Sequence, residues 1–233
     1  MNDPTLPPPP VPPGDTMPPP LPWEDGSTGF LPGLFATAKL FVLSPQEAFN
    51  RMSRTGLGRP LFYAVIMAWI ELLVGFAYWF AFQAPFFAAG FPELRNEMGG
   101  IAVGASVMVL IAIGTAIAMP ILMAFYIFLH TCILHLALLI VGEGKGGFET
   151  TFRLLCYAHT ADLGNVVPLC GGIISFVWFV VLQVVGVAEA HRCPYGKATL
   201  AVLLPLLVCC ACVAVALSLG IGTAILGSLS NHS

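Results

Sequence analysis

Charge is scarce in this sequence. Asp, Glu, Lys and Arg together make up 9% of the 233 residues, hydrophobic residues make up 58%, and the mean hydropathy is +0.88. A soluble domain has about 25% charged residues, so this composition excludes one. Apolar runs longer than about eighteen residues recur after residue 60, which favours transmembrane helices over barrel strands that alternate apolar and polar residues. The sequence therefore predicts an all-α fold, a polytopic transmembrane helical bundle.

Signals of several other protein classes are missing. The chain does not start with a basic segment and an apolar core, so we expect no cleavable signal peptide. It contains no HExxH, no GxSxG and no comparable pairing of nucleophile and base, so we expect no enzyme and no cofactor or metal. Cys193 lies in a polar loop. The other six cysteines lie within or beside apolar runs, where they act as small hydrophobes and not as a disulfide framework: Cys132, Cys156, Cys170, Cys209, Cys210 and Cys212.

The longest uncharged stretch runs from Ile101 to Val141. As one helix it would be roughly 60 Å long, about twice the thickness of the hydrocarbon core of a bilayer. It is either one long bent helix or two spans that meet at Pro120. A hairpin there would need a polar residue or a glycine beside Met119-Pro120, and neither is present, whereas a proline inside one transmembrane helix only kinks it. We therefore expect a single span.

The N-terminal part divides into two segments. Residues 1–22 are rich in proline and have little to bury, which predicts a disordered tail that serves as a spacer or as a ligand for a proline-binding domain. Residues 23–59 predict two short amphipathic helices at the membrane interface, with candidate anchors Trp23, Arg51, Arg54 and Arg59. Ser44-Pro45-Gln46-Glu47 predicts a capping box at the start of the second helix.

Five spans are expected in residues 60–227, followed by a short tail at 228–233. The predicted spans are Leu61–Phe82, Ile101–Val141, Thr151–Val167, Leu169–Ala188 and Ala198–Leu226. Thr151–Val167 is the shortest and most polar, so we expect it to be packed inside.

Lysine and arginine set the expected orientation. With five spans, Arg95 is alone on one side of the membrane. Eight basic residues share the other side, which the positive-inside rule identifies as the cytoplasm: Lys39, Arg51, Arg54, Arg59, Lys145, Arg153, Arg192 and Lys197. Crossing twice between Ile101 and Val141 would give a four-to-five split. We expect a cytoplasmic N-terminus and a C-terminus on the far side.

Glu71, His159 and Asp162 form a candidate intramembrane polar cluster. Each lies in an otherwise apolar span, where an ionisable side chain is expensive and should face other helices or a water-filled cleft. His159 and Asp162 are three residues apart and share a helical face. The cluster is either a hydrogen-bonded group that holds the helices in register, or a proton relay or half of a metal site.

Three further motifs favour structural roles. Gly142, Gly144 and Gly147 match GxGxxG, but no strand precedes them, so we expect no nucleotide. We also expect no nucleic-acid partner. Cys209 and Cys212 form a CxxC in mid-span without a basic neighbour. His130 and His135 are five residues apart and lie on different faces of a helix, so they are not a chelating pair like the i, i+4 histidines of a zinc helix.

The chain also resembles a known family. The residues that carry the resemblance are Pro22-Trp23-Glu24, Thr37, Leu43-Ser44-Pro45, Ala48-Phe49, Met52, Arg59-Pro60, Phe148, Thr151-Phe152-Arg153, Tyr157-Ala158, Pro168, Gly171-Gly172, Trp178, Glu189-Ala190-His191 and Lys197-Ala198. In order and spacing they are similar to prokaryotic members of the Yip family, the five-span domain named for Rab-interacting proteins.

The resemblance implies a five-span membrane fold over residues 23–210. Eukaryotic relatives act in membrane traffic and bind Rab GTPases, but this chain lacks the acidic DLYGP-like segment of those members. The leading hypothesis is a non-enzymatic protein of a prokaryotic cell membrane that organises the bilayer or binds protein partners. Self-association through the transmembrane helices remains open. The alternative is a small transporter or channel that uses Glu71, His159 and Asp162.

Overall fold

The computed structural model describes residues 18–83 and 101–230, and every regular element within them is a helix. The predicted all-α fold is therefore confirmed. Most of the proline-rich tail, the loop with Arg95 and the last three residues lie outside the described residues. The elements are α1 (Phe30–Leu43), α2 (Pro45–Arg51), α3 (Gly58–Tyr78), the π-helix η1 (Trp79–Gln83), α6 (Ile101–Val141), the 3-10 helix η2 (Gly144–Gly146), α7 (Gly147–Ala158), the 3-10 helix η3 (His159–Val166), α8 (Gly171–His191) and α9 (Tyr195–Ser230).

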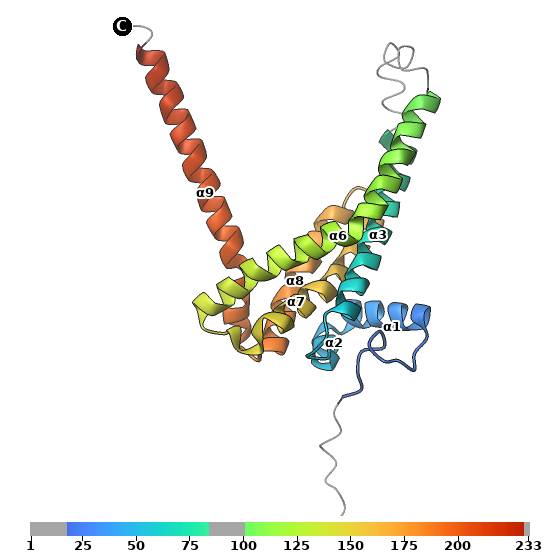
Figure 1. The fold of residues 1–233 in the computed structure, drawn as a ribbon. Coiled ribbons are helices and arrows are strands. Elements are labelled where there is room, and N and C mark those ends of the chain that lie inside the picture. Colours follow the sequence, from blue (N-terminus) through green and yellow to red (C-terminus); the bar gives the residue numbers. More distant parts are fainter. Residues whose placement is uncertain (1–17, 84–100, 231–233) are drawn as a thin grey trace, which may run out of the picture.

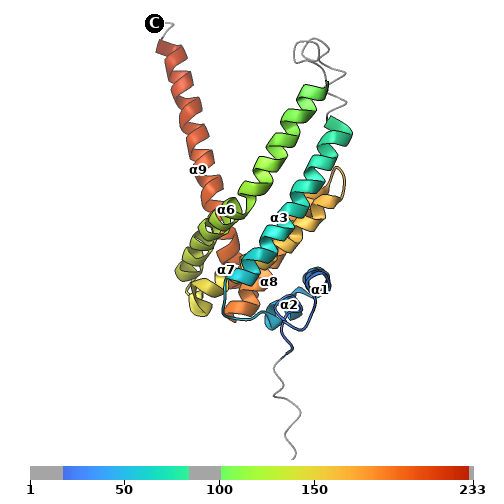
Figure 2. The same ribbon diagram turned by 45° about the vertical axis from the view of Figure 1, so that its right-hand side comes forward.

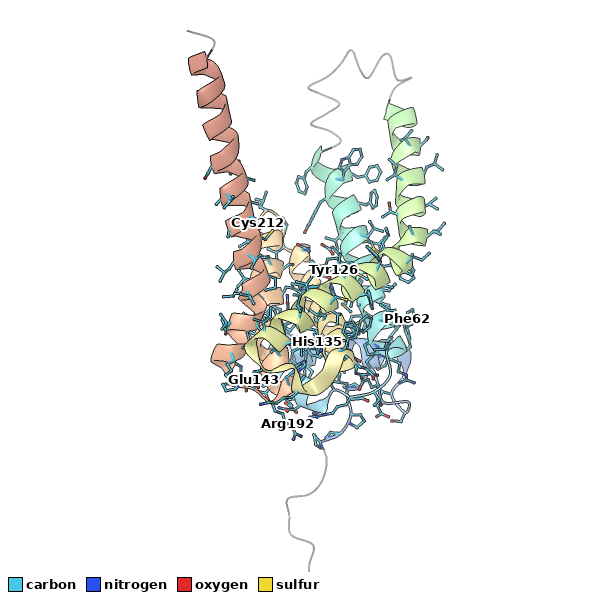
Figure 3. The ribbon with its side chains drawn as sticks, turned by 60° about the vertical axis from the view of Figure 1, so that its left-hand side comes forward. Phe62, Tyr126, His135, Glu143, Arg192 and Cys212 are labelled. Atoms are coloured by element: carbon cyan, nitrogen blue, oxygen red, sulfur yellow. The ribbon has the colours of Figure 1, made fainter. Side chains whose placement is uncertain are left out.

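The helices run alternately along the bundle. From the end that carries α1 and α2, α3 leads away, α6 returns, α7 and η3 lead away again, α8 returns and α9 leads away (Figure 1). The described C-terminus is therefore at the opposite end from the short N-terminal helices. Figure 3 shows Glu143 and Arg192 at the end with α1 and α2, which we call the base.

Within the described parts of the chain, four helices are long and apolar enough to cross a membrane: Gly58–Phe82, Val109–Val141, Gly171–His191 and Tyr195–Ser218. The fifth predicted span, Thr151–Val167, is built differently. It is the short α-helix α7 followed by the 3-10 helix η3. The change follows from composition, because His159, Asp162, Gly164 and Asn165 are weak helix formers that favour tighter turns.

This divided span fills the centre of the bundle. Every residue from Thr150 to Ala161 is buried, as expected for a span packed inside. α7 packs against α3, α6 and α8, while η3 packs against α3 and α8. The core is therefore formed around an element that lipid does not reach, which explains how Arg153 and His159 can lie within it.

The stretch Ile101–Val141 is one helix with Pro120 inside it, as predicted. Figure 1 shows that α6 changes direction along its length. Because proline has no N–H, Pro120 leaves the carbonyl of Ala116 without its partner within the helix. The indole Nε1 of Trp69 on α3 donates to that carbonyl at 3.0 Å. A neighbouring helix thus satisfies the group that the proline exposes.

The two N-terminal helices lie at the base. α2 packs on α8, where Phe49 covers Gly186 so closely that a Cβ there would come within 2.8 Å of the phenyl ring. Pro45 occupies the first turn of α2 as predicted, but the side chain of Ser44 makes no capping hydrogen bond. The capping-box prediction is therefore wrong. Ser44 also ends α1, where its N–H donates to the carbonyl of Leu40 at 2.8 Å, and this double role fixes its backbone.

α9 is the least covered of the long helices. It packs on α6 and α8, and its outer part then runs apart from α3 and α6 (Figure 2). Residues 206–218 are all exposed in the isolated chain. A helix that is apolar on every side and uncovered is suited to contact with lipid.

Candidate functional site

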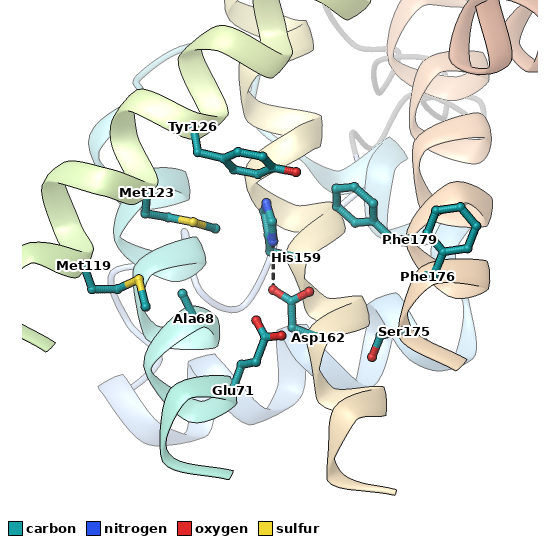
Figure 4. Close-up of a pocket in the computed structure, with 10 residues that line it drawn as sticks. All are labelled: Ala68, Glu71, Met119, Met123, Tyr126, His159, Asp162, Ser175, Phe176 and Phe179. Atoms are coloured by element: carbon teal, nitrogen blue, oxygen red, sulfur yellow. Dashed lines mark hydrogen bonds and ion pairs between the residues drawn. The ribbon is translucent and has the colours of Figure 1, made fainter. Parts of the chain in front are cut away.

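A cavity of about 320 Å³ lies between α3, α6, η3 and α8 (Figure 4). Its walls contain all three members of the predicted polar cluster, Glu71, His159 and Asp162. Glu71 comes from α3 and the other two from η3, so the cluster forms only when these elements pack together. The remaining lining residues are Ala68, Met119, Met123, Tyr126, Ser175, Phe176 and Phe179.

Two hydrogen bonds order the acidic side of the cavity. His159 Nδ1 lies 2.8 Å from a carboxylate oxygen of Asp162, so the two residues do pair as their spacing predicts. The side-chain amide of Asn165 donates to Glu71 at 2.8 Å. Asn165 was not predicted as part of this cluster, although its place in the same polar segment of η3 is a signal. Nearby, the hydroxyls of Tyr63 and Thr160 are 2.8 Å apart and also join α3 to η3.

One nitrogen at the cavity is left without a partner. His159 is 7% exposed, and its Nε2 has no hydrogen-bond partner within the described part of the chain. The imidazole lies beside two aromatic rings, with centroid distances of 5.8 Å to Tyr126 and 5.1 Å to Phe179. A buried polar atom without a partner is expensive, so Nε2 is available to a ligand or a water molecule.

The cavity has more acidic than basic side chains. Its lining includes two carboxylates and one imidazole, and no lysine or arginine from the described residues. Glu71 is exposed in the isolated chain although it lies about 20 Å along α3, close to mid-span. Within residues 18–83 and 101–230, no group of three His, Cys, Asp or Glu side chains is placed to hold a metal ion.

A second polar centre lies at the base, around Arg153 of α7. Arg153 is 1% exposed, and its guanidinium pairs with the carboxylate of Glu24. Glu24 also accepts hydrogen bonds from the Tyr157 hydroxyl at 2.7 Å and from the backbone N–H of Ser53 at 2.8 Å. A buried ion pair needs such additional hydrogen bonds to offset the loss of hydration. We call this group the Glu24–Arg153 network.

The network ties the whole N-terminal segment to the bundle. Arg153 also donates to the carbonyls of Thr55 and Gly56, which precede α3. Arg59 donates to the carbonyl of Glu24 at 2.8 Å, and the indole of Trp23 donates to the carbonyl of Arg59 at 2.8 Å. The sequence did not predict the pairing of Glu24 with Arg153. The available signal was a single arginine in an apolar span, which requires a counter-charge, but 129 residues separate the partners.

The proposed interfacial anchors have different surroundings. Trp23 is buried against Phe30 and Tyr63, whereas Arg54 is exposed. Arg51 pairs with Glu47 one turn away at 2.5 Å. The large exposed apolar side chains of α1 are Phe30, Leu31, Phe35, Val42 and Leu43. The anchoring roles of Trp23, Arg51, Arg54 and Arg59 stay predictions.

The histidines of the long helix are in separate places. His130 lies near Tyr126 and Phe179 beside the cavity, while His135 lies near the base. The hydroxyl of Thr151 lies 3.0 Å from His135 Nδ1 and 3.1 Å from His191 Nε2. His191 Nδ1 accepts the backbone N–H of Gly146 at 3.1 Å. His135 and His191 therefore help to hold η2, α7 and α8 together.

The glycine-rich turn between α6 and α7 has an ionic centre of its own. Glu143 lies 2.8 Å from Lys145 Nζ and 2.6 Å from Lys197 Nζ. The hydrogen bonds and positive charges of these lysines lower the pKa of Glu143 to about 2, and Glu143 in turn raises the pKa of Lys145. The turn thus fastens the start of α9. Cys209 and Cys212, the predicted CxxC, are exposed on the apolar surface of α9.

Comparison with known proteins gives one family. A family model described as the Yip1 domain matches residues 39–217. Searches of curated proteins and of solved structures returned no match.

Proposed function

The chain belongs to the Yip1 domain family, and from this premise we propose that it is a non-enzymatic membrane scaffold that organises the bilayer or binds protein partners. The observation that carries this proposal is the Glu24–Arg153 network. A buried ion pair with several further hydrogen bonds attaches residues 21–59 to α7 of the bundle. A scaffold must present a surface of defined shape. The network holds the N-terminal helices in place, so the surface that they form is fixed. The apolar side chains of α1 lie on that surface.

We further propose a location in a prokaryotic cell membrane, with the base in the cytoplasm. One observation and one general rule support this orientation. The turns that hold Lys145 and Arg192 lie at the same end as α1 and α2. An excess of lysine and arginine marks the cytoplasmic side of a membrane protein. The organisation that we propose is a tail at 1–22, base helices at 23–59, a membrane domain at 60–227 and a short tail at 228–233.

Site-specific photo-cross-linking tests the scaffold role. A photoreactive amino acid replaces Phe35, which is 70% exposed on α1, or Leu136, which is 59% exposed on α6 and serves as the control. In native membranes we expect a discrete protein adduct from position 35 and lipid adducts alone from position 136. The protein adduct should disappear when Arg153→Met is added, because the base is then no longer fixed. Lipid adducts alone at both positions would contradict partner binding through α1.

Proton- or cation-coupled transport is a second candidate, and the acidic cavity is the observation that favours it. Asp162 separates the two roles. If the cluster only holds helices together, Asp162→Asn keeps the hydrogen bond to His159 and is tolerated, whereas Asp162→Leu costs ~1 kcal/mol or more. A transporter needs the charge itself. We would abandon the scaffold if Asp162→Asn gave a stable, normally abundant protein that no longer complemented a deletion strain.

A further inference from the structure

We propose that the cavity between α3, α6, η3 and α8 binds a primary ammonium group that carries a small apolar chain or ring. The inference deepens the second candidate function, but it concerns binding and does not require that the bound amine crosses the membrane. It rests on the hydrogen-bonding character of the polar atoms, the charge of the cavity and the chemistry of its walls.

Most of the free polar atoms of the cavity are acceptors, and the Ser175 hydroxyl, which also has no partner among the described residues, can accept as well as donate. An ionised carboxylate can only accept hydrogen bonds, so the short contact between Asp162 and His159 places a proton on Nδ1. In a neutral imidazole the other nitrogen, Nε2, is then an acceptor, and it has no partner among the described residues. The remaining oxygens of Glu71 and Asp162 are acceptors as well. The matching ligand is a donor, and an ammonium group supplies three N–H bonds.

The acidic lining of the cavity favours a cation. Two acidic side chains, Glu71 and Asp162, face one imidazole, so the cavity is net negative whenever both carboxyl groups are ionised, even beside a charged His159. No described lysine or arginine lines the cavity to neutralise it. A carboxylate at mid-span is expensive, and Glu71, which is exposed in the isolated chain, has the neutral amide of Asn165 as a partner but no described lysine or arginine in the cavity lining. A bound cation would remove this penalty.

The walls favour an organic cation over a bare ion. Tyr126, Phe176 and Phe179 supply aromatic faces, which attract ammonium groups. Met119 and Met123 are flexible and adapt to apolar groups of different shapes. A volume of about 320 Å³ is at the small end of the range of about 300–1,000 Å³ that is typical of ligand pockets. The bound group is therefore small.

Two sources can supply this chemistry: a free lipophilic amine, or the ethanolamine headgroup of a phospholipid. Both present the same ammonium group next to apolar carbon. The experiment therefore begins in a bilayer without any primary amine, and the lipid is then exchanged.

The test uses the full chain in phosphatidylcholine nanodiscs, with empty nanodiscs as the background for partitioning. We expect saturable binding of n-hexylammonium, and binding of n-hexanol and of n-hexyltrimethylammonium at least tenfold weaker, since the first lacks charge and the second lacks N–H donors. Glu71→Gln and Asp162→Asn should each weaken hexylammonium binding at least tenfold. Glu47→Gln, which removes an exposed charge at the base, should leave it unchanged.

The outcomes separate clearly. Equal binding of hexanol, unchanged binding in folded Glu71→Gln and Asp162→Asn, or no saturable binding at all would overturn the inference. The ligand is the lipid headgroup if phosphatidylethanolamine competes with hexylammonium. Native mass spectrometry should then find this lipid bound to the wild type and absent from Asp162→Asn. Absence of such competition identifies a free amine. Saturable binding of hexylammonium without transport would contradict the transporter hypothesis and leave the binding inference intact. The cross-linking at position 35 tests only the scaffold hypothesis.

Discussion

Arg153 shows how one side chain can hold distant parts of this chain together. It lies in α7 with an exposed fraction of 1%, and it contacts Glu24, Thr55 and Gly56. Removing one partner of a buried ion pair leaves an uncompensated charge, whereas an exposed pair contributes little because water screens it. The pair of Arg51 and Glu47 is of the second kind and provides a control in the same segment.

We expect Arg153→Met to lower the free energy of unfolding by about 3 kcal/mol, since Glu24 stays buried without its partner. Arg51→Met should cost about 0.5 kcal/mol or less. Thermal unfolding of the purified chain in detergent measures both. The double variant Glu24→Met with Arg153→Met should lose less stability than the two single losses added together. If Arg153→Met and Arg51→Met had equal effects, the network would not fix the base.

Glu143 leads to a prediction about pH. Its pKa is about 2 in the folded chain, against an ordinary value of 4.5, because Lys145 and Lys197 stabilise the carboxylate. The folded state therefore binds a proton less readily than the unfolded state does. The stability from this group is complete above about pH 4.5 and is lost as the pH falls toward 2.

The wild type should therefore exceed Glu143→Gln in melting temperature by a constant margin between pH 5 and 9. Below pH 4.5 the margin should shrink. Because both chains share every other titrating group, the difference between them isolates Glu143. A margin that grew on acidification would show that the two lysines do not stabilise the carboxylate.

At the scale of elements, α6 and α3 depend on each other at the proline. Pro120 frees the carbonyl of Ala116, and Trp69 satisfies it at 3.0 Å. A proline in a transmembrane helix is tolerated where such a partner exists. The indole therefore joins the two helices and also stabilises the bend.

Trp69→Phe removes the donor and keeps most of the ring, and we expect a loss of about 1 kcal/mol, as for a typical hydrogen bond. In a Pro120→Ala chain, the introduced alanine supplies a backbone N–H to the carbonyl of Ala116, so the same Trp69→Phe change should cost clearly less. The free energy of unfolding, measured for the wild type, the two single variants and the double variant, gives the coupling energy between Trp69 and Pro120. Equal costs in both backgrounds would mean that the indole does not act through the carbonyl.

At the scale of the whole molecule, the base gathers the short helices and the turns of the described chain that carry Lys145 and Arg192. The opposite end carries the outer parts of α3, α6 and α9. The positive-inside rule predicts this arrangement, with the basic turns at the same end as the N-terminal helices, for a protein whose N-terminus is in the cytoplasm.

Single cysteines in a chain without its native cysteines test this orientation. A membrane-impermeant thiol reagent applied to intact cells should label Glu93→Cys and should miss Lys145→Cys and Arg192→Cys until the membrane is opened. Lys145 and Arg192 are suitable positions because the Lys145 side chain is 67% exposed and Arg192 is exposed as well. Labelling of all three positions in intact cells would contradict the proposed topology.

Much of the fold could be predicted because each long span is specified locally. Length and apolar composition predicted α3, α6, α8 and α9, and the absence of a turn signal at Pro120 predicted one helix there. The i, i+3 spacing predicted that His159 and Asp162 share a helical face, and the two side chains are in contact. These features depend on neighbours a few residues away, so the sequence shows them directly.

By itself, the sequence determined that this is a helical membrane protein, because a bilayer admits few other solutions for long uncharged segments. The tertiary structure alone decided which polar groups from distant parts of the chain meet. Glu24 reaches Arg153 across 129 positions, and Glu71 reaches the cavity of His159 and Asp162 from a separate helix. Local patterns cannot specify such pairs, since they depend on which helix faces pack together. Packing also decided that the shortest predicted span, which its weak helix formers divide into α7 and η3, lies inside the bundle.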